Sequence, residues 1–190
     1  MNTKDFFNSK ADKWNDGITN EERLSAKSII DSLGIKDNMK VLDLACGTGI
    51  VSSFIYNQSK TKVVAIDLSE NMITKAKELN KNDNIEFRCI DFFELNESFD
   101  YIVCFNAYPH FLDVEKFKQK LYSSLNNGGY FAICHNISRK ELDSHHAAHC
   151  MNISRFLDEV NEEAKKYSNL FEIIKSSESN SHYLIIGKKK

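Results

Sequence analysis

Short apolar runs alternate along the chain with stretches in which apolar residues recur at helical spacing. The runs are typical of buried β-strands, and we expect strands at residues 40–45, 62–66, 85–90, 101–105 and 130–134. The helical spacing predicts one helix before them, at residues 21–33, and helices between them at residues 49–57, 70–79 and 114–125. Strands that alternate with helices predict an α/β fold with a mostly parallel, doubly wound sheet.

The C-terminal part of the chain predicts a reversal of strand direction. Two further β-type runs, residues 171–174 and 183–186, are joined by a turn-rich stretch that is too short for a crossover helix. They should therefore pair as an antiparallel hairpin and complete a seven-stranded sheet. We also expect an irregular aromatic opening at residues 6–14, a polar stretch at 137–152 and a helix around 153–167.

Length and composition limit the class of protein further. A chain of 190 residues with 42% hydrophobic residues predicts one soluble domain over residues 1–190. The net charge of −2 argues against nucleic acid as a partner, and the apolar runs are too short to span a membrane. The N-terminus has no apolar signal region, which indicates a cytoplasmic protein. We expect a monomer or a homodimer.

One motif, residues 41–49 (VLDLACGTG), combines an apolar strand with a glycine-rich turn that leads into a helix. Glycines let the backbone approach a ligand closely, and a helix N-terminus offers unpaired N–H groups to an anion. A second apolar strand ends in Asp67, eighteen residues after Gly49. A carboxylate at that point suits the two hydroxyls of a ribose, so the motif predicts a nucleotide-like cofactor.

Two details favour S-adenosylmethionine over a dinucleotide. A dinucleotide motif carries a third glycine-like residue three positions after its second glycine, where this chain has Ser52. Asp43 lies inside the motif, where a carboxylate would repel a pyrophosphate but attract an ammonium group. S-adenosylmethionine has an ammonium group, a carboxylate and a ribose, and it has no phosphate.

With these residues the chain resembles the class I S-adenosylmethionine-dependent methyltransferases, close to the ubiquinone/menaquinone-biosynthesis type. Residues 43–49 are similar to the glycine motif of that family, with Ala45 where many members have a first glycine. Asp67 is similar to its ribose acid, residues 90–92 (IDF) to its adenine-binding turn, and residues 127–129 (NGG) to the turn before its fifth strand. The resemblance implies the strand order 3-2-1-4-5-7-6.

The predicted roles on the cofactor side follow from charge and shape. Gly47 and Gly49 should give the backbone room beside the methionine moiety, while Asp43 attracts its ammonium group. Asp67 should accept both ribose hydroxyls, Leu68 should pack on the adenine, and Asp91 should accept from the adenine amine. Three more residues complete the predicted cofactor set: Ala45, Phe92 and Asn106. The alternative is that Asp67 only caps a helix and Asp91 only shapes a turn.

Histidines mark the side where a methyl acceptor would bind, because ligands bind at the carboxyl ends of parallel strands. His110 follows the fourth strand and His135 ends the fifth. His146 lies further along the chain, in the polar stretch 137–152. His110 or His135 could act as a general base or orient the acceptor, or neither could have a direct role. Together with His146 they could instead hold a divalent metal such as Zn²⁺ or Fe²⁺.

Other residues on the acceptor side leave alternatives open. Asn106 begins Asn-Ala-Tyr-Pro, which departs from the Asn/Asp-Pro-Pro-aromatic motif of amino-group methyltransferases but places Asn106 at the methyl-transfer site. Tyr108 is our candidate for an apolar substrate pocket, with core packing as the alternative. Trp14 and the aromatic residues before it resemble the family's N-terminal lid, over residues 1–20, or they pack a terminal helix. Ser138 and Glu141 form a predicted capping box at the start of the substrate-side segment 136–152.

The sequence therefore predicts methyl transfer from S-adenosylmethionine to a small-molecule acceptor. Asn106, His110 and His135 are the candidate catalytic residues, and Trp14, Tyr108, His110, His135 and His146 are the candidate substrate residues. A metal-assisted methyltransferase is one alternative to this prediction. A module that binds S-adenosylmethionine without catalysis is the other.

Overall fold

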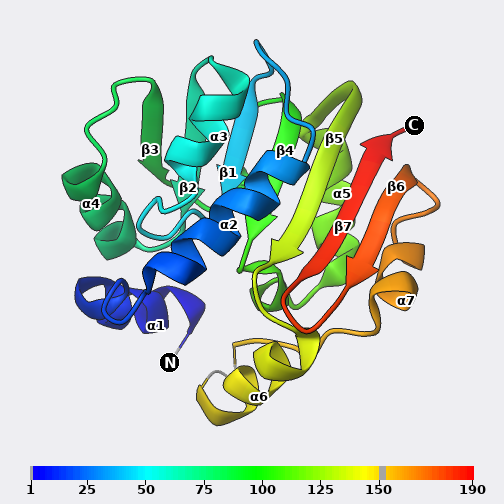
Figure 1. The fold of residues 1–190 in the computed structure, drawn as a ribbon. Helices are drawn as coiled ribbons and strands as arrows, with labels where there is room; N and C mark the ends of the chain where they lie inside the picture. Colours follow the sequence, from blue (N-terminus) through cyan, green and yellow to red (C-terminus); the bar gives the residue numbers. More distant parts are fainter. Residues whose placement is uncertain (1, 150–152) are drawn as a thin grey trace.

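A seven-stranded sheet forms the centre of the protein (Figure 1). The computed structural model describes residues 2–149 and 153–190, except the side chains of His146, Ala148 and His149. The strands are β1 (Val41–Leu44), β2 (Val63–Asp67), β3 (Ile85–Cys89), β4 (Phe99–Phe105), β5 (Leu125–His135), β6 (Phe171–Glu178) and β7 (Tyr183–Lys189). Their order is β3-β2-β1-β4-β5-β7-β6, and only the pairs of β7 with β5 and β6 are antiparallel among the described strands. The predicted fold class and strand order are confirmed.

Helices cover both faces of this sheet. One face packs against α2 (Asn20–Ser32), α3 (Ser52–Ser59) and α4 (Glu70–Leu79), and the other packs against α5 (Val114–Ser123) and α7 (Val160–Lys165). The central strands alternate between the two cores, since Val41 joins the α2 side and Leu42 joins the α5 side. Burial on both faces explains why these strands read as continuous apolar runs.

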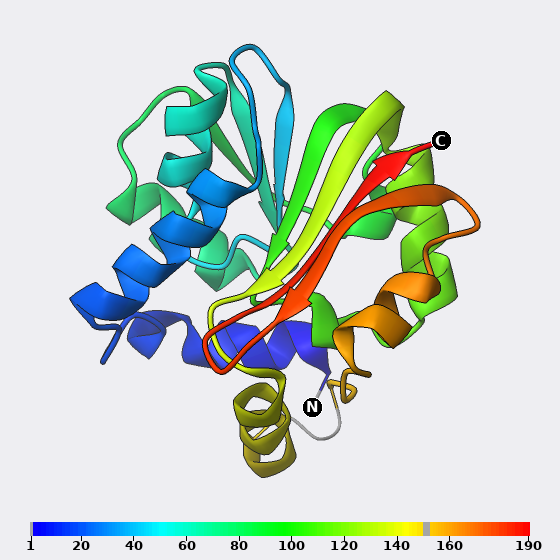
Figure 2. The same cartoon turned by 45° about the vertical axis from the view of Figure 1, so that its right-hand side comes forward.

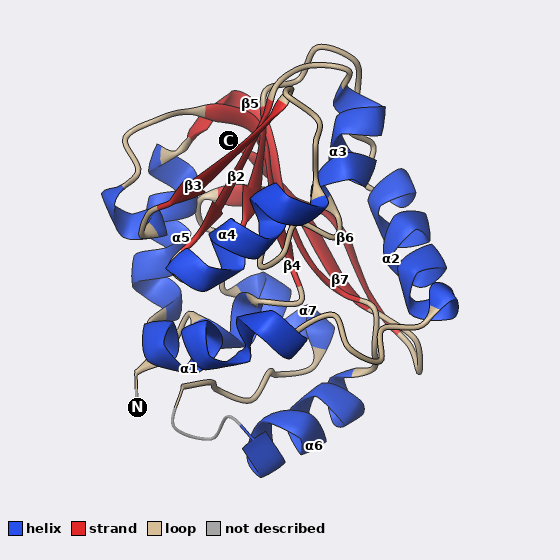
Figure 3. Ribbon diagram, turned by 90° about the vertical axis from the view of Figure 1, so that its left-hand side faces the viewer, coloured by secondary structure: helices blue, strands red, loops and turns tan. Residues whose placement is uncertain are grey.

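Two further helices lie at the carboxyl ends of the parallel strands. These helices are α1 (Thr3–Lys10) and α6 (Arg139–His149), and Figures 2 and 3 show both at that end of the molecule. The opening segment was predicted to be irregular, but Asn2 accepts from the backbone N–H of Asp5 and starts a helix there. A short 3₁₀ turn, Ala11–Lys13, follows α1. The N-terminal segment is therefore a structured element next to the predicted site.

The predicted helix ends are confirmed at two capping residues. Ser69 Oγ accepts from the backbone N–H of Met72 at 3.1 Å and begins α4. Ser138 and Glu141 form the predicted capping box at α6, because Ser138 Oγ accepts from the N–H of Glu141 and the Glu141 carboxylate accepts from the N–H of Ser138. None of the helices in residues 2–149 and 153–190 combines the length and apolarity that a membrane span requires.

Two predicted elements after β4 differ from the structure. The helix expected around 153–167 is shorter, Val160–Lys165, because the backbone N–H groups before it do not form helical i→i−4 bonds: that of Arg155 donates to the carbonyl of Pro109, and those of Leu157 and Asp158 donate to the side chains of Asp143 and Glu163. The Asn-Gly-Gly turn expected before the fifth strand lies inside β5. There the pairing register with β4 shifts, so that the extra residues form an irregularity within the strand.

Candidate active site

The glycine motif forms a tight loop at the carboxyl end of β1. Three of its residues have positive φ angles: Ala45 (57°), Gly47 (53°) and Gly49 (76°). The backbone N–H of Cys46 donates to the carbonyl of Ile66 at 2.9 Å and ties the loop to β2. A left-handed conformation costs a non-glycine residue about 1–2 kcal/mol, so Ala45 occupies a strained position. This explains why many members of the family that the chain resembles have a glycine there.

Asp67 lies beside this loop, where the predicted cofactor set requires it. Its Oδ2 accepts from the backbone N–H of Gly47 at 2.9 Å, and its Oδ1 accepts from the N–H of Ser69 at 2.8 Å. Burial raises the pKa of Asp67, while these backbone hydrogen bonds act in the opposite direction. The two predicted cofactor elements, the glycine loop and the acid after β2, are thus in direct contact.

Asp43 lies beneath the loop and is fully buried. Ser52 Oγ donates to its Oδ2 at 2.5 Å. Burial raises the pKa of Asp43 to about 7, because the hydrogen bond from Ser52 offsets only part of the desolvation and the charge on Asp67 adds to it. A cation close to Asp43 would stabilise its charged form, which agrees with the predicted attraction of an ammonium group.

The N-terminal segment covers the loop. Trp14 lies above Gly47, since a Cβ atom built at Gly47 would be 3.6 Å from the Trp14 Nε1. Thr48 Oγ1 donates to Asn15 Oδ1 at 2.8 Å, and Ser69 Oγ donates to Asn8 Oδ1 at 2.6 Å. The predicted lid segment is therefore attached to both cofactor elements by polar side chains.

Two predicted cofactor residues belong to the packing of the fold. A Cβ atom at Gly49 would be 2.7 Å from the Phe87 ring and 2.9 Å from Asn80 Nδ2, so this glycine is required by the approach of β3. Phe92 is 3% exposed and packs in the core against Phe117. Packing accounts for both residues in the described structure, and the contacts of Gly49 with the methionine moiety and of Phe92 with the adenine stay predictions.

Leu68 and Asp91 remain available to a ligand at this edge of the sheet. Leu68 directly follows β2 and is 37% exposed. Asp91 caps the 3₁₀ turn Phe92–Glu94, where its Oδ1 accepts from the N–H of Phe93 at 2.9 Å. Asp91 thus has the turn role that was the alternative, and its other carboxylate oxygen is not used by this contact.

Asn106 joins the ends of the neighbouring strands β4 and β5 on the acceptor side. Its backbone has a φ of 53°, and its Nδ2 donates to Asn136 Oδ1 at 2.8 Å. In return, the backbone N–H of Asn136 donates to Asn106 Oδ1 at 3.2 Å. This reciprocal pair fixes the amide of Asn106 at the carboxyl ends of β4 and β5.

His110 lies between the N-terminal segment and residues 153–158. Its Nδ1 is 3.0 Å from the carbonyl oxygen of Ile153, and its ring meets the Phe7 ring edge to face at a centroid distance of 4.9 Å. A carbonyl can only accept, so Nδ1 carries the proton and the lone pair of the neutral ring is on Nε2. Burial lowers the pKa of His110 and thereby favours the neutral ring.

Of the other two predicted histidines, the structure describes the side chain of His135 only. His135 is fully buried at the end of β5, with its ring against Tyr183. The side chain of His146 lies outside the described residues. Within the described part of the chain, no three histidine, cysteine, aspartate or glutamate residues come together as metal ligands would.

Tyr108 packs in the core, which is the alternative to its predicted role in a substrate pocket. Its side chain is fully buried, and its hydroxyl donates to Glu163 Oε1 at 2.6 Å and accepts from the Tyr167 hydroxyl at 2.7 Å. The aromatic run after β4 is typical of a pocket as well as of a core. The residues that decide between the two are the hydrogen-bond partners of Tyr108, and they lie more than fifty positions away in the sequence.

Sequence reasoning missed the residues that hold the acceptor side in place. Arg155, which is 17% exposed, and the fully buried Glu163 form an ion pair at 2.8 Å, and no motif near either residue indicates it. Asn8 and Asn15 contact the cofactor elements from a segment in which only the aromatic residues give a sequence signal. Asn136 had a usable signal, since it directly follows the fifth strand and carboxyl ends of strands carry ligand contacts.

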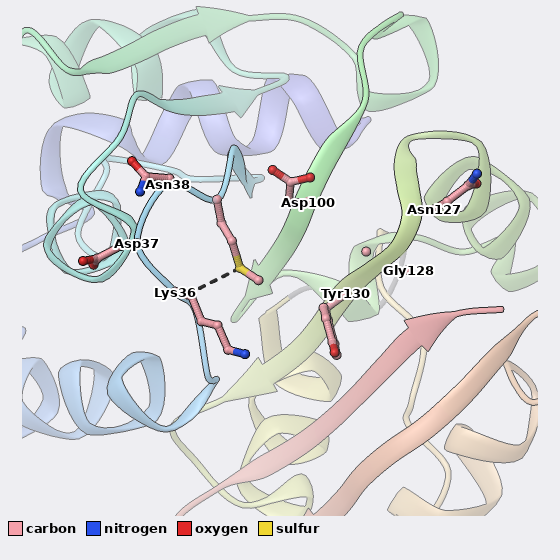
Figure 4. Close-up of a pocket in the computed structure, with 9 residues that line it drawn as sticks. Lys36, Asp37, Asn38, Asp100, Asn127, Gly128 and Tyr130 are labelled. Carbon is pink, nitrogen blue, oxygen red and sulfur yellow. Dashed lines mark hydrogen bonds between the residues drawn. The ribbon is translucent and has the colours of Figure 1, made fainter.

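A cavity of about 260 Å³ lies away from all of these residues (Figure 4). Residues 36–39, Asp100 and residues 127–130 line it, at the amino ends of the parallel strands. The backbone N–H of Lys36 donates to Met39 Sδ there at 3.4 Å. Because ligands of parallel sheets bind at the opposite, carboxyl ends, this cavity is separate from the candidate site.

Curated proteins of similar sequence include a malonyl-[acyl-carrier protein] O-methyltransferase from Acetivibrio thermocellus, which is 26% identical over 165 residues. That match covers 84% of this chain and 58% of the relative. A methyltransferase of Schizosaccharomyces pombe without a characterised activity is 32% identical over 107 residues, which cover 50% of this chain and 37% of the relative. The chain thus spans less than two thirds of the length of these relatives.

Solved structures with the same fold include a methyltransferase from Haloferax volcanii in complex with the Trm112 activator, with a TM-score of 0.83 and 16% identity. The match covers 96% of this chain and 97% of that one. Magnesium protoporphyrin IX methyltransferase from Synechocystis, with bound S-adenosylhomocysteine, has a TM-score of 0.73, 18% identity and coverage of 98% and 97%. A sequence profile described as a methyltransferase domain matches residues 35–186. The chain belongs to this methyltransferase domain family.

Proposed function

We propose that this protein transfers a methyl group from S-adenosylmethionine to a small-molecule acceptor. The contact between the Asp67 carboxylate and the N–H of Gly47 carries the proposal, because it joins the ribose acid and the glycine loop at one point. Membership of the methyltransferase domain family supports it, as does the S-adenosylhomocysteine bound by a structural neighbour.

The residues around this contact fit the cofactor. Asp67 uses one lone pair of each oxygen for a backbone N–H, which leaves acceptor capacity for ribose hydroxyls. Asp43, whose pKa is near 7, would gain from an ammonium group nearby. The exposed Leu68 offers an apolar surface for the adenine. When bound, S-adenosylmethionine supplies a sulfonium-activated methyl group, so these residues need only hold and orient it.

On the acceptor side, His110 is the proposed general base. Its Nε2 carries the lone pair of the neutral ring and would take the proton that a hydroxyl or amine acceptor must lose on methylation. Asn106 is the proposed orienting group, since Asn136 fixes its amide at the strand ends. The N-terminal segment, with Trp14 above Gly47, is the proposed lid that excludes water.

The acceptor class rests on relatives that are named for a malonyl group on a carrier protein and for magnesium protoporphyrin IX. These names favour a small or carrier-bound molecule over nucleic acid, in line with the net charge of −2. The metal-assisted alternative is not part of the proposal, since the described residues bring no three potential ligands together.

Calorimetry with S-adenosylhomocysteine tests the cofactor half of the proposal. Asp67→Ala should weaken binding at least about tenfold, because it removes the charged acceptor of the ribose hydroxyls. Asp113→Ala is the matched control, since Asp113 is also a carboxylate that accepts from a backbone N–H at a helix start, on α5. An unchanged affinity in Asp67→Ala would remove the ribose assignment.

Label transfer tests the catalytic half. The wild-type protein is incubated with methyl-labelled S-adenosylmethionine and a cell metabolite extract, beside His110→Gln. We expect label in a small molecule, at a rate at least about tenfold lower in the variant. Tight binding of S-adenosylhomocysteine without any transferred label would instead favour a non-catalytic binding module.

A further inference from the structure

We infer that Glu163 is a positioning residue for His110, which it controls through Arg155 and the segment 153–158. The inference rests on the proposed function in one respect, namely that His110 acts on the methyl acceptor. Glu163 lies in α7, on the α5 side of the sheet, and Arg155 lies in the irregular segment before it. His110 ends a short 3₁₀ turn after β4.

Glu163 is the centre of a buried polar cluster. Its carboxylate is fully buried and accepts five hydrogen bonds. Two of these come from the Arg155 guanidinium, at 2.8 and 3.2 Å, and the others come from Tyr108, Lys166 and the backbone N–H of Asp158. Burial alone would raise the pKa of Glu163, but the donors, Arg155 first, hold it below its usual value. The carboxylate is therefore charged and fully engaged.

Arg155 connects this polar cluster to the turn that carries His110. Its guanidinium lies over the Tyr108 ring, 4.5 Å from the ring centroid. Its backbone N–H donates to the carbonyl of Pro109 at 3.0 Å. The side chain of Arg155 thus fixes the segment 153–158 to α7, and its backbone fixes the same segment to the residue before His110.

Ile153 completes the connection, two residues before Arg155. Its carbonyl oxygen accepts a hydrogen bond from the N–H at His110 Nδ1, at 3.0 Å. This hydrogen bond selects the ring tautomer in which the lone pair is on Nε2, as a general base requires. The position of the Ile153 carbonyl depends on the segment that Arg155 and Glu163 hold.

Loss of the charge on Glu163 should therefore change the tautomer of the His110 ring. Without that charge, the largely buried Arg155 guanidinium has lost its counter-ion and its bidentate partner, which favours movement of the segment toward solvent. The Ile153 carbonyl would then no longer define the proton position on His110. A purely structural role of Glu163 would lower stability but leave the tautomer of the folded protein unchanged.

Nitrogen NMR of the histidine rings distinguishes these two roles without any substrate. The protein is labelled with ¹⁵N histidine, and His110 is assigned by the signals that His110→Gln removes. In wild-type protein we expect one tautomer, protonated on Nδ1. In Glu163→Gln we expect a mixture of the two neutral tautomers, and an unchanged single tautomer would overturn the inference.

Glu162→Gln is the matched control, because Glu162 is the preceding residue of α7 and forms an exposed ion pair with Lys165. This variant should retain the wild-type ring signals, and a tautomer change in both variants alike would overturn the specific role of Glu163. If Glu163→Gln does not fold, Arg155→Lys replaces it, since lysine keeps the charge but loses the bidentate contact and the stacking on Tyr108. The same mixture of tautomers is expected there.

Turnover provides the second readout, through initial rates of label transfer in single and double variants. Glu163→Gln should lower the rate at least about tenfold in the wild-type background but should have little further effect in His110→Gln. Equal losses in both backgrounds would overturn the inference, because they show that Glu163 acts independently of His110. A normal rate in His110→Gln would contradict the proposed role of His110 instead, and the NMR result would then decide the inference alone.

Discussion

The cofactor half and the acceptor half of the site each contain a fully buried carboxylate, and the two are treated in opposite ways. Asp43, under the glycine loop, accepts from Ser52 Oγ, and burial raises its pKa to about 7. Glu163, behind the acceptor side, accepts five hydrogen bonds, and its pKa is held below the usual value. Donors from the protein stabilise the charged form of Glu163. Burial instead favours the protonated, neutral form of Asp43.

This difference indicates that Glu163 stabilises the fold and that Asp43 is suited to a ligand. A carboxylate with a bidentate arginine and three further donors has little capacity left for another partner. A buried carboxylate with a single hydroxyl donor gains from a cation, as an ammonium group would provide under the proposed function. We therefore expect substitution of Glu163 to affect folding, and substitution of Asp43 to affect folding in a manner that depends on pH.

The largest effect is expected for Glu163→Leu. It removes the counter-ion of Arg155 and should lower the free energy of unfolding by about 3–5 kcal/mol, as measured by urea denaturation. The control Glu162→Leu, at an exposed position of the same helix, should change it by less than about 1 kcal/mol.

A second substitution tests the cause of that loss. Glu163→Leu combined with Arg155→Met removes both charges, leaves no buried ion without a partner, and should recover most of the lost stability. If the double variant were as unstable as the single one, the lost packing of α7 rather than the unpaired guanidinium would be responsible. Recovery of stability without recovery of the His110 tautomer would agree with the positioning role.

An intermediate effect is expected for Asp43→Asn, and it depends on pH. The pKa of Asp43 is about 7 in the folded state, against a reference value of 3.8. Between these two values the folded state binds more protons than the unfolded state, so wild-type stability falls as pH rises from about 4 to about 7. Asparagine does not titrate, and it can still accept from Ser52.

The stability of Asp43→Asn relative to wild type should therefore increase by about 3 kcal/mol between pH 5 and pH 8, as measured by urea denaturation at each pH. A relative stability that stays constant over this range would show that Asp43 does not keep its proton in the folded state. S-adenosylhomocysteine should bind the variant more weakly, because the attraction to its ammonium group is lost.

Sequence reasoning succeeded where contacts are local and failed where they are distant. The glycine loop, the Ser69 cap and the acid after β2 depend on backbone turns within a few residues, and residue type reports such turns directly. The contacts of the acceptor side join residues that lie far apart in the chain: Tyr108 and Glu163 are 55 positions apart, and His110 and Ile153 are 43 apart. Only the folded sheet brings them together, so the pattern around Tyr108 could not distinguish core from pocket.

Gly49 shows that even a local motif combines two requirements, packing and binding. Motif reasoning assigned Gly47 and Gly49 the same role, and both have positive φ angles. The space around them differs, since a Cβ atom at Gly49 would overlap the Phe87 ring at 2.7 Å, whereas one at Gly47 would meet Trp14 Nε1 at an ordinary 3.6 Å.

Alanine substitutions at the two glycines should separate these requirements, with the smallest effect of the three comparisons. Both variants share the cost of a left-handed alanine, so the further loss of about 2 kcal/mol in Gly49→Ala measures the overlap with Phe87 and Asn80. Urea denaturation measures this difference, and calorimetry with S-adenosylhomocysteine should show the greater loss of affinity in Gly47→Ala.

The companion variant Gly49→Ala with Phe87→Leu identifies the source of the extra loss. A leucine side chain removes the ring edge that the new Cβ would meet, and part of the lost stability should return despite the smaller core residue. No recovery would locate the conflict at Asn80, whose Nδ2 donates to the carbonyl of Thr48 in the same loop. Equal stability of the two single alanine variants would contradict the packing role of Gly49 and leave only the binding role that the motif predicts.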